Sequence, residues 1–130
     1  MDPSPTLTPA KIADQQSQHG LDLLAANDAN AAEHAFRAAI AAQYDHVEAH
    51  HGLVRALADQ QRLEPAIAAA LRLTALTPQD PLAHTSLSIA LQRAGHIPEA
   101  ESASARARIL EWKQQLANPE LTPTEGAPFV

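Results

Sequence analysis

Residues 47–80 read VEAHHGLVRALADQQRLEPAIAAALRLTALTPQD, and this stretch decides the fold because the chain repeats its outline on both sides. Units that begin at Ala13, Val47 and Pro81 share a small residue at one position, occupied by Ala32, Ala66 and Ala100. The same register aligns one leucine in each unit, at Leu23, Leu57 and Leu91. A fixed period of roughly 34 residues predicts a stack of similar two-helix units.

Local signals for helix ends agree with this period. Thr8 before Pro9, and Asp80 before Pro81, each offer a capping side chain followed by a proline suited to the first helical position. Asn30 and Asp45 are each followed by a glutamate at capping-box spacing, which predicts two further helix starts. Each unit also has one residue at the turn between its helices, namely Asn27, Gln61 and Gly95. Asn and Gly suit a left-handed turn conformation.

These signals predict an all-α chain with six helices. We expect them near residues 9–26, 30–43, 46–60, 64–76, 81–94 and 98–117. Alanine supplies much of the 45% hydrophobic content and only 3% of residues are aromatic, so the core is expected to come from close helix contacts and leucines. The last helix is expected to be extended, because its apolar pattern continues past the end of the third unit.

Three features carry a resemblance to a known family: the aligned alanines, Pro78 at the end of the second unit, and Phe36 in the second helix of the first unit. In these features the chain resembles the tetratricopeptide repeat (TPR) family. The resemblance covers residues 13 to about 117, with repeats at about 13–46, 47–80 and 81–114. It departs from the family where a tryptophan near each unit's start is replaced, by Gln16, His50 and His84. The family's aromatic site is also lost in the later units, at Ala70 and Ser104.

The resemblance implies a right-handed superhelical stack of helix-turn-helix repeats whose first helices line a concave groove. It also implies a protein that binds another protein or peptide segment there. Carried over residue by residue, the groove positions present in this chain are Asp14, Ser17, Leu21, Leu24, Glu48, His51, Arg55, Asp59, Leu82, Thr85, Ile89, Gln92 and Arg93. A subgroup of the family grips a terminal carboxylate, but Ser17 and Leu21 stand at its first two gripping positions, so that mode is not supported.

The end of the last helix offers a second candidate interface. Ile109, Leu110, Trp112 and Leu116 extend its apolar pattern. Trp112 and Leu116 are expected either to cap the stack and be buried in it or to be covered by a second subunit, which makes a homo-oligomer one option. Trp112 is expected to be buried in both cases.

Composition and motifs limit the function classes. A net charge of −6 argues against nucleic-acid binding, which needs clustered Lys and Arg. No cysteine is present, so disulfides and thiolate metal sites are excluded. No stretch approaches the ~18 apolar residues of a membrane helix, so no membrane insertion is expected. The start shows no secretory signal, which favours a cytoplasmic protein. Residues 9–117 are expected to form one domain between two disordered tails, 1–8 and 118–130.

Seven histidines raise the question of metal binding or catalysis. His46 and His50 have the i, i+4 spacing that can place two imidazoles on one helix face, and His51 and Glu48 are close in sequence. No third ligand is identifiable and no zincin or nucleophile-elbow motif occurs. His50 and His84 recur at one repeat position, which favours a packing role. No cofactor, metal or enzymatic activity is therefore expected.

The sequence leaves two main classes of function open. The first is a protein-protein interaction scaffold or assembly subunit that binds a partner polypeptide through the groove or the last helix. The alternative is a secretion-type or assembly chaperone that holds a client protein. A histidine-based metal-binding protein is a distant third reading. Stoichiometric co-purification, suppression of client aggregation and bound metal, respectively, would distinguish the three classes.

Overall fold

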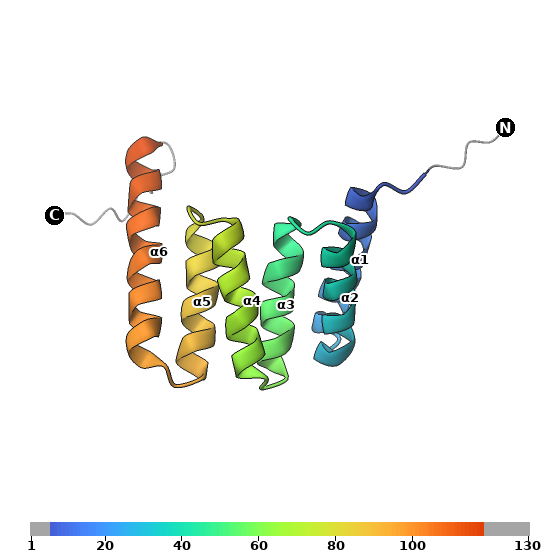
Figure 1. The fold of residues 1–130 in the computed structure, drawn as a ribbon, viewed down its shortest axis with the longest axis horizontal. Helices are drawn as coiled ribbons and strands as arrows, with labels where there is room; N and C mark the ends of the chain where they lie inside the picture. Colours follow the sequence, from blue (N-terminus) through green and yellow to red (C-terminus); the bar gives the residue numbers. More distant parts are fainter. Residues whose placement is uncertain (1–5, 119–130) are drawn as a thin grey trace.

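A computed structural model describes residues 6–118, which form six α-helices (Figure 1). In chain order these helices are α1 (Pro9–Ala25), α2 (Ala29–Ala42), α3 (Val47–Asp59), α4 (Leu63–Leu76), α5 (Pro81–Arg93) and α6 (Ile97–Ala117). The all-α prediction is confirmed, and so is the extended last helix, since α6 has 21 residues and the others have 13 to 17. Residues 1–5 and 119–130, which hold most of the two tails expected to be disordered, lie outside the described residues.

The 34-residue period is visible in the helix boundaries. The second helices of the three units begin at Ala29, Leu63 and Ile97, which are 34 residues apart. All three turn residues have positive φ, as expected for Asn27 (65°) and Gly95 (87°) and also at Gln61 (61°). We call α1 with α2 unit one, α3 with α4 unit two, and α5 with α6 unit three. Each unit packs against the next, through α2 against α3 and α4 against α5.

Helix caps follow the sequence at two predicted starts and differ at two others. The Thr8 hydroxyl accepts a hydrogen bond from the Lys11 amide, and the Asp80 carboxylate accepts one from Leu82, as expected. The predicted caps Asn30 and Asp45 are wrong. Asp28 caps α2, where its carboxylate accepts from the Ala31 amide, and His46 caps α3, where Nδ1 accepts from Ala49 at 3.2 Å. A histidine cap is missed because capping preferences come from Ser, Thr, Asp and Asn.

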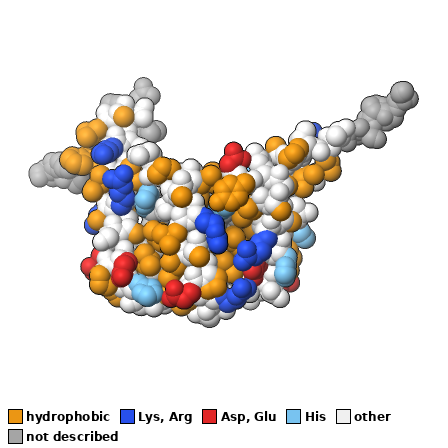
Figure 2. All heavy atoms as spheres, in the orientation of Figure 1, with side chains coloured by type: hydrophobic (Ala, Val, Ile, Leu, Met, Phe, Trp, Pro, Cys, Tyr) orange, Lys and Arg blue, Asp and Glu red, His pale blue; other side chains and the backbone are white. Residues whose placement is uncertain are grey.

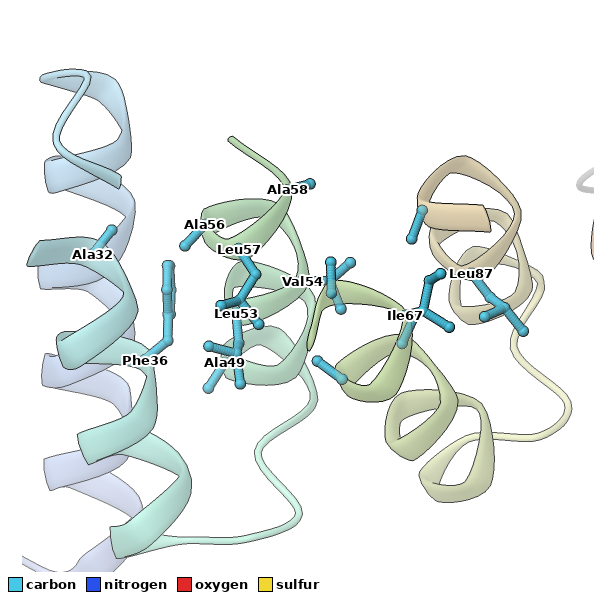
Figure 3. Packing of buried hydrophobic residues seen from close by; sticks show 14 of the residues in the cluster. Ala32, Phe36, Ala49, Leu53, Val54, Ala56, Leu57, Ala58, Ile67 and Leu87 are labelled. Carbon is cyan, nitrogen blue, oxygen red and sulfur yellow. The ribbon is translucent and has the colours of Figure 1, made fainter. Parts of the chain in front are cut away.

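The core consists of alanines and leucines around one ring (Figure 3). Phe36 of α2 is 0% exposed and lies between α1 and α3. A Cβ added to Gly20 of α1 would lie 2.7 Å from this ring, and one added to Gly52 of α3 would overlap the same ring atoms. The two glycines therefore form a slot for Phe36, because only a residue without a side chain lets the ring approach both helix backbones. We call this arrangement the Phe36 slot.

Two histidines at one repeat position form matching hydrogen bonds. His50 Nε2 lies 2.6 Å from the Tyr44 carbonyl oxygen, and His84 Nε2 lies 2.9 Å from that of Pro78. Each ring donates to a carbonyl six residues earlier, in the turn that connects one unit to the next. The repeated histidine thus fixes this turn, and the space left by the family's tryptophan is filled by a group that also satisfies a backbone oxygen.

A charged cluster on Glu33 of α2 also joins units one and two. This buried carboxylate accepts from Arg37 Nε at 2.8 Å, from Arg62 Nη1 at 2.6 Å and from Gln60 Nε2 at 3.0 Å. Burial alone would raise the pKa of Glu33, but hydrogen bonds from Gln60 and Arg37 and the positive charges of Arg62 and Arg37 outweigh burial and lower it. Glu33 therefore remains charged and bound at neutral pH.

One of the two expectations from the sequence was that the end of α6 caps the stack. The structure shows that it does not. Ala100, Ala103, Ala107 and Leu110 pack inward, but every residue from Glu111 to Ala117 is exposed. Trp112 is 62% exposed and Leu116 is 66% exposed, so burial of Trp112 within its own stack is wrong. The reason is geometric, because α6 has eight more residues than the 13 of α5 and its last turns pass beyond the neighbouring helix. Between residues 6 and 118, no helix combines the length and apolarity needed to cross a bilayer.

Candidate functional site

The first helices of units two and three enclose a pocket of about 400 Å³. We call it the α3/α5 pocket, and it is lined by His51, Val54, Arg55, Ala58, Asp59, Ser86, Ile89, Ala90 and Arg93. The contributing residues of α3 recur at spacings of three and four, which place them on one face of the helix. Val54, Ala58 and Ala90 are buried and form an apolar floor, and the partly open side carries the charged groups.

Two arginines share one carboxylate at this pocket. Arg55 Nε lies 3.9 Å from Asp59 Oδ2, and Arg93 Nη1 lies 4.0 Å from Asp59 Oδ1. These distances are at the outer limit for ion pairs, and all three side chains are substantially exposed. Such pairs contribute little to stability. Asp59 instead keeps the two guanidinium groups near each other, and the group of three retains one net positive charge that can face an acidic ligand.

The other end of the pocket holds a neutral hydrogen-bonding pair. His51 Nδ1 lies 3.1 Å from the Ser86 hydroxyl oxygen, which joins α3 to α5. Burial lowers the pKa of His51, and the neighbouring His50 lowers it further, while Asp80 and Glu48 offset the shift only in part. The ring is therefore neutral at pH 7. If Nδ1 accepts from Ser86, Nε2 carries the proton and remains a donor.

The structure brings together five of the residues carried over from the family. His51, Arg55, Asp59, Ile89 and Arg93 all line the α3/α5 pocket. The remaining groove positions do not line this pocket: Asp14, Ser17, Leu21, Leu24, Glu48, Leu82, Thr85 and Gln92. Among these, Leu21 and Leu82 are exposed, and Gln92 lines a separate polar pocket between α5 and α6.

Two groove assignments in unit one require correction. Ser17 and Leu24 are buried, so they do not present their side chains on a groove surface. The cause is that α1 packs against both α2 and α3, and these contacts cover that face of α1. These two positions therefore do not extend the α3/α5 pocket into unit one.

Four lining residues were missed from the sequence: Val54, Ala58, Ser86 and Ala90. Ser86 and Ala90 each follow a carried-over position, Thr85 and Ile89, by one residue. The pocket-facing side of α5 therefore includes the expected Ile89 and Arg93 but also extends one residue beyond the expected positions. The usable signal was the small size of Ala58, Ser86 and Ala90, since small side chains leave space between adjacent helices.

The histidines at the start of α3 have different partners. His46 Nε2 lies 2.7 Å from Asp14 Oδ1 of α1, while His50 Nε2 is bound to the Tyr44 carbonyl. Their rings are used to join helices, which supports the packing interpretation of the i, i+4 pair. Within the described part of the chain, no group of three or more His, Cys, Asp or Glu side chains could hold a metal ion.

The exposed end of α6 forms a second candidate surface. Ile109, Trp112 and Leu116 are exposed at spacings of three and four, so they form one apolar stripe. The stripe differs from the buried face at Ala103, Ala107 and Leu110. An exposed apolar stripe of this kind typically marks an interaction surface.

A family model described as tetratricopeptide repeat matches residues 17–81. No curated protein shows significant sequence similarity to the chain. Among solved structures, MamA is similar with a TM-score of 0.75 and 22% identity, over 80% of this chain and 61% of MamA. The chain therefore spans about three fifths of that protein's length.

Two further solved structures share the fold. The second TPR of Spaghetti (RPAP3), bound to the HSP90 peptide SRMEEVD, has a TM-score of 0.73 and 17% identity, with 78% of this chain and 94% of that chain covered. The Yersinia enterocolitica type III secretion translocator chaperone SycD has a TM-score of 0.72 and 18% identity, with 83% and 79% covered. At such identities the likeness concerns the arrangement of helices.

Proposed function

The chain belongs to the tetratricopeptide repeat family, and from this premise we propose that it binds a segment of a partner polypeptide in the α3/α5 pocket. The fold is one that typically mediates protein interactions. We assign residues 9–117, with repeats at about 13–46, 47–80 and 81–114, as the interaction domain.

One observation carries the proposal: the α3/α5 pocket combines an apolar floor with a shared arginine pair. Val54, Ala58 and Ala90 can receive an apolar side chain of the partner. Arg55 and Arg93, held by Asp59, can receive a carboxylate. A partner segment with one acidic residue and a nearby apolar residue therefore fits this pocket.

The comparison with the peptide-bound Spaghetti domain supports this chemistry. Its ligand SRMEEVD is acidic, which is consistent with an acidic segment held on this fold. Ser17 and Leu21 do not supply the cationic and amide groups that grip a terminal carboxylate, and Ser17 is buried. We therefore propose an internal acidic segment in place of a chain end.

A quantitative affinity capture tests the proposal. The wild type, the double variant Arg55→Glu with Arg93→Glu, and a control with Arg106→Glu and Arg108→Glu are each used to capture proteins from native extract, read by mass spectrometry. The control makes the same change in charge on exposed residues of α6. A partner retained by the wild type and the control but lost by the pocket variant supports binding at the α3/α5 pocket.

Equal retention by all three proteins would place the binding site away from the α3/α5 pocket. Circular dichroism of each variant is needed as a control for folding. Arg55 and Arg93 are exposed and make only long ion pairs, so we expect both variants to keep the helical spectrum of the wild type.

A chaperone role is the second candidate, favoured by the similarity to a type III secretion translocator chaperone. A chaperone would release its client and keep it from aggregating, whereas an assembly subunit would remain bound at fixed stoichiometry. Mixing the captured partner with the protein, followed by light scattering and by size-exclusion chromatography, separates the two roles.

We also propose that the stripe at Ile109, Trp112 and Leu116 pairs with a second copy of the chain. These residues form an exposed apolar stripe on α6, and the stripe is removed from water when it packs against the same stripe of another copy. Light scattering should show a dimer that Trp112→Glu dissociates, and a wild type that is monomeric at high concentration would contradict this pairing.

A further inference from the structure

A second hollow lies on another face of α3, between α2 and α4. Its volume is about 270 Å³, and its lining comprises Arg37, Ile40, Ala41, Tyr44, His50, Leu53 and Arg72. We call it the α2/α4 hollow. Its floor is formed by His50 and Leu53 of α3. The residues that directly follow them, His51 and Val54, line the α3/α5 pocket. One residue is about 100° around a helix, so the two openings lie on different faces of α3.

Arginines stand on both walls of the α2/α4 hollow. Arg37 donates to Glu33, but this carboxylate is also bound by Arg62, so the cluster of three keeps one positive charge. Arg72 lies on the opposite wall, is exposed, and makes no ion pair with any residue between 6 and 118. Figure 2 shows Lys and Arg side chains gathered beside hydrophobic surface over α2 to α4. This patch is positive although the whole chain carries −6.

The aromatic wall of the hollow is held in place. The Tyr44 side chain is 57% exposed and meets the His50 ring edge to face, with centroids 5.2 Å apart. His50 is 1% exposed and bound to the Tyr44 carbonyl, so it cannot turn away. The buried His50 ring, beside Ile40 and Leu53, gives an apolar side chain a preformed contact, and Tyr44 lies next to it.

The hollow at the corresponding place in the next repeat has no arginine in its lining. A hollow between α4 and α6 contains His84 and Leu87, which correspond to His50 and Leu53 one repeat earlier. At the position of Arg37 it has Leu71. Exposed charges often serve only solubility. Here, however, two arginines flank an apolar floor, whereas the hollow at His84 and Leu87 is lined by Leu71 and Glu99 and by no arginine.

We propose that the α2/α4 hollow is a second peptide site, which takes an acidic segment with one apolar side chain. The apolar side chain enters between Tyr44 and Leu53, and flanking carboxylates of the segment meet Arg37 and Arg72. A volume of about 270 Å³ is enough for one leucine or phenylalanine side chain. The site differs from the α3/α5 pocket in face and residues, so a partner can bridge both or two segments can bind together.

Selection from a phage-displayed library of random linear peptides tests the proposal. Enriched peptides are then measured by fluorescence polarisation on the wild type, Arg72→Glu, Arg106→Glu, and the double variant Arg55→Glu with Arg93→Glu. Arg106 is the matched control because it occupies the position of Arg72 one repeat later. We expect enriched peptides with Asp or Glu around an apolar residue, whose Kd rises at least tenfold on Arg72→Glu only.

Three outcomes would overturn the proposal. One is that no acidic peptide is enriched. Another is that acidic peptides are enriched but bind Arg72→Glu as tightly as the wild type, which would assign them to the α3/α5 pocket if the double variant loses them. The third is that Arg72→Glu changes the oligomeric state by light scattering, because the patch would then contact a second copy. The first two outcomes leave the proposed α3/α5 function to its own capture experiment.

Discussion

The junction between units one and two is filled by a large ring, whereas the junction between units two and three is built from small side chains. In the first, Phe36 lies between Gly20 and Gly52. In the second, the residues one repeat later are Ala70, Val54 and Ser86. Val54 and Ser86 line the α3/α5 pocket. The same repeat positions can therefore either fill a junction with a large side chain or, when their side chains are small, leave an accessible pocket beside it.

The lining positions of the two first helices correspond, and most of them are buried in both units. Ser17, Gly20 and Leu24 of unit one correspond to His51, Val54 and Ala58 of unit two, and all of these except His51 are buried. The same face of the next first helix is open to ligands. On this face of the stack, the junction near the N-terminus is therefore closed and the junction near the C-terminus holds the α3/α5 pocket, while the α2/α4 hollow opens on another face.

Phe36→Ala should have the largest effect on stability, because it removes the ring that fills the junction between units one and two. The ring is 0% exposed, and its removal leaves a cavity between two glycines that cannot fill it. We expect unfolding free energy to fall by about 3–5 kcal/mol. Urea unfolding measures the loss, and Ser104→Ala, at the same position in unit three, should change stability by less than about 0.5 kcal/mol. Equal effects would contradict the asymmetry.

Gly52→Ala should destabilise the closed junction by a smaller amount. Its Cβ would overlap the Phe36 ring, so the ring or α3 must move, at a cost of about 1–3 kcal/mol. The matched control is Ser86→Ala, one repeat later, which adds no atom and loses only the hydrogen bond to His51, so the change should be about 1 kcal/mol or less. Thermal melts of both variants distinguish a tight slot from a general intolerance of these helix positions.

Acid should weaken the two junctions in separate pH ranges. The pKa of His51 at the open junction is lowered, so its neutral form is favoured in the fold, and stability falls as pH drops below the ordinary value of 6.5. The pKa of Glu33 at the closed junction is also lowered, so its contribution is complete above 4.5 and is lost as pH falls through the lower folded value.

Urea midpoints measured across these ranges test the assignment. His51→Gln should remove part of the pH dependence below 6.5, and Glu33→Gln should remove part of that below 4.5. Each variant serves as the control for the other. A His51→Gln profile parallel to that of the wild type would show that His51 does not sense acid at the open junction.

Trp112→Gln should have the smallest effect on stability of the isolated chain. The side chain is 62% exposed beyond the last inward residue of α6, so we expect a change within about 0.5 kcal/mol at low concentration. Trp112 is the one tryptophan of the chain, and its emission maximum reports its surroundings directly. Water-like emission that shifts to the blue as concentration rises would indicate pairing through α6.

Much of the fold could be predicted because the 34-residue period places recognisable residue types at equivalent positions of each unit. The alanines at close contacts and the turn residues Asn27, Gln61 and Gly95 each require a particular shape of the backbone or of its surroundings. The caps at Asp28 and His46 could not be predicted in the same way. Several candidate side chains stand near each start, and the tertiary contact of His46 with Asp14 selects among them.

The candidate site was predicted only in part. Arg55, Asp59 and Arg93 follow from the register, and the structure places them together. The burial of Ser17 depends on how closely α1 approaches α2 and α3, which the period does not specify. The α2/α4 hollow was missed because Arg37, Tyr44 and Arg72 come from two second helices and a turn, and only packing brings them to one opening.

The order of the two junctions along the chain also bears on how the protein is made. Both glycines of the Phe36 slot and the ring itself lie before residue 53, so this part can pack while α6 is still being synthesised. At ~5–20 residues per second, the ribosome needs roughly 3–13 seconds to add the rest of the helical domain. A nascent chain that orders its aromatic centre first keeps the Phe36 ring away from neighbouring polypeptides during that interval.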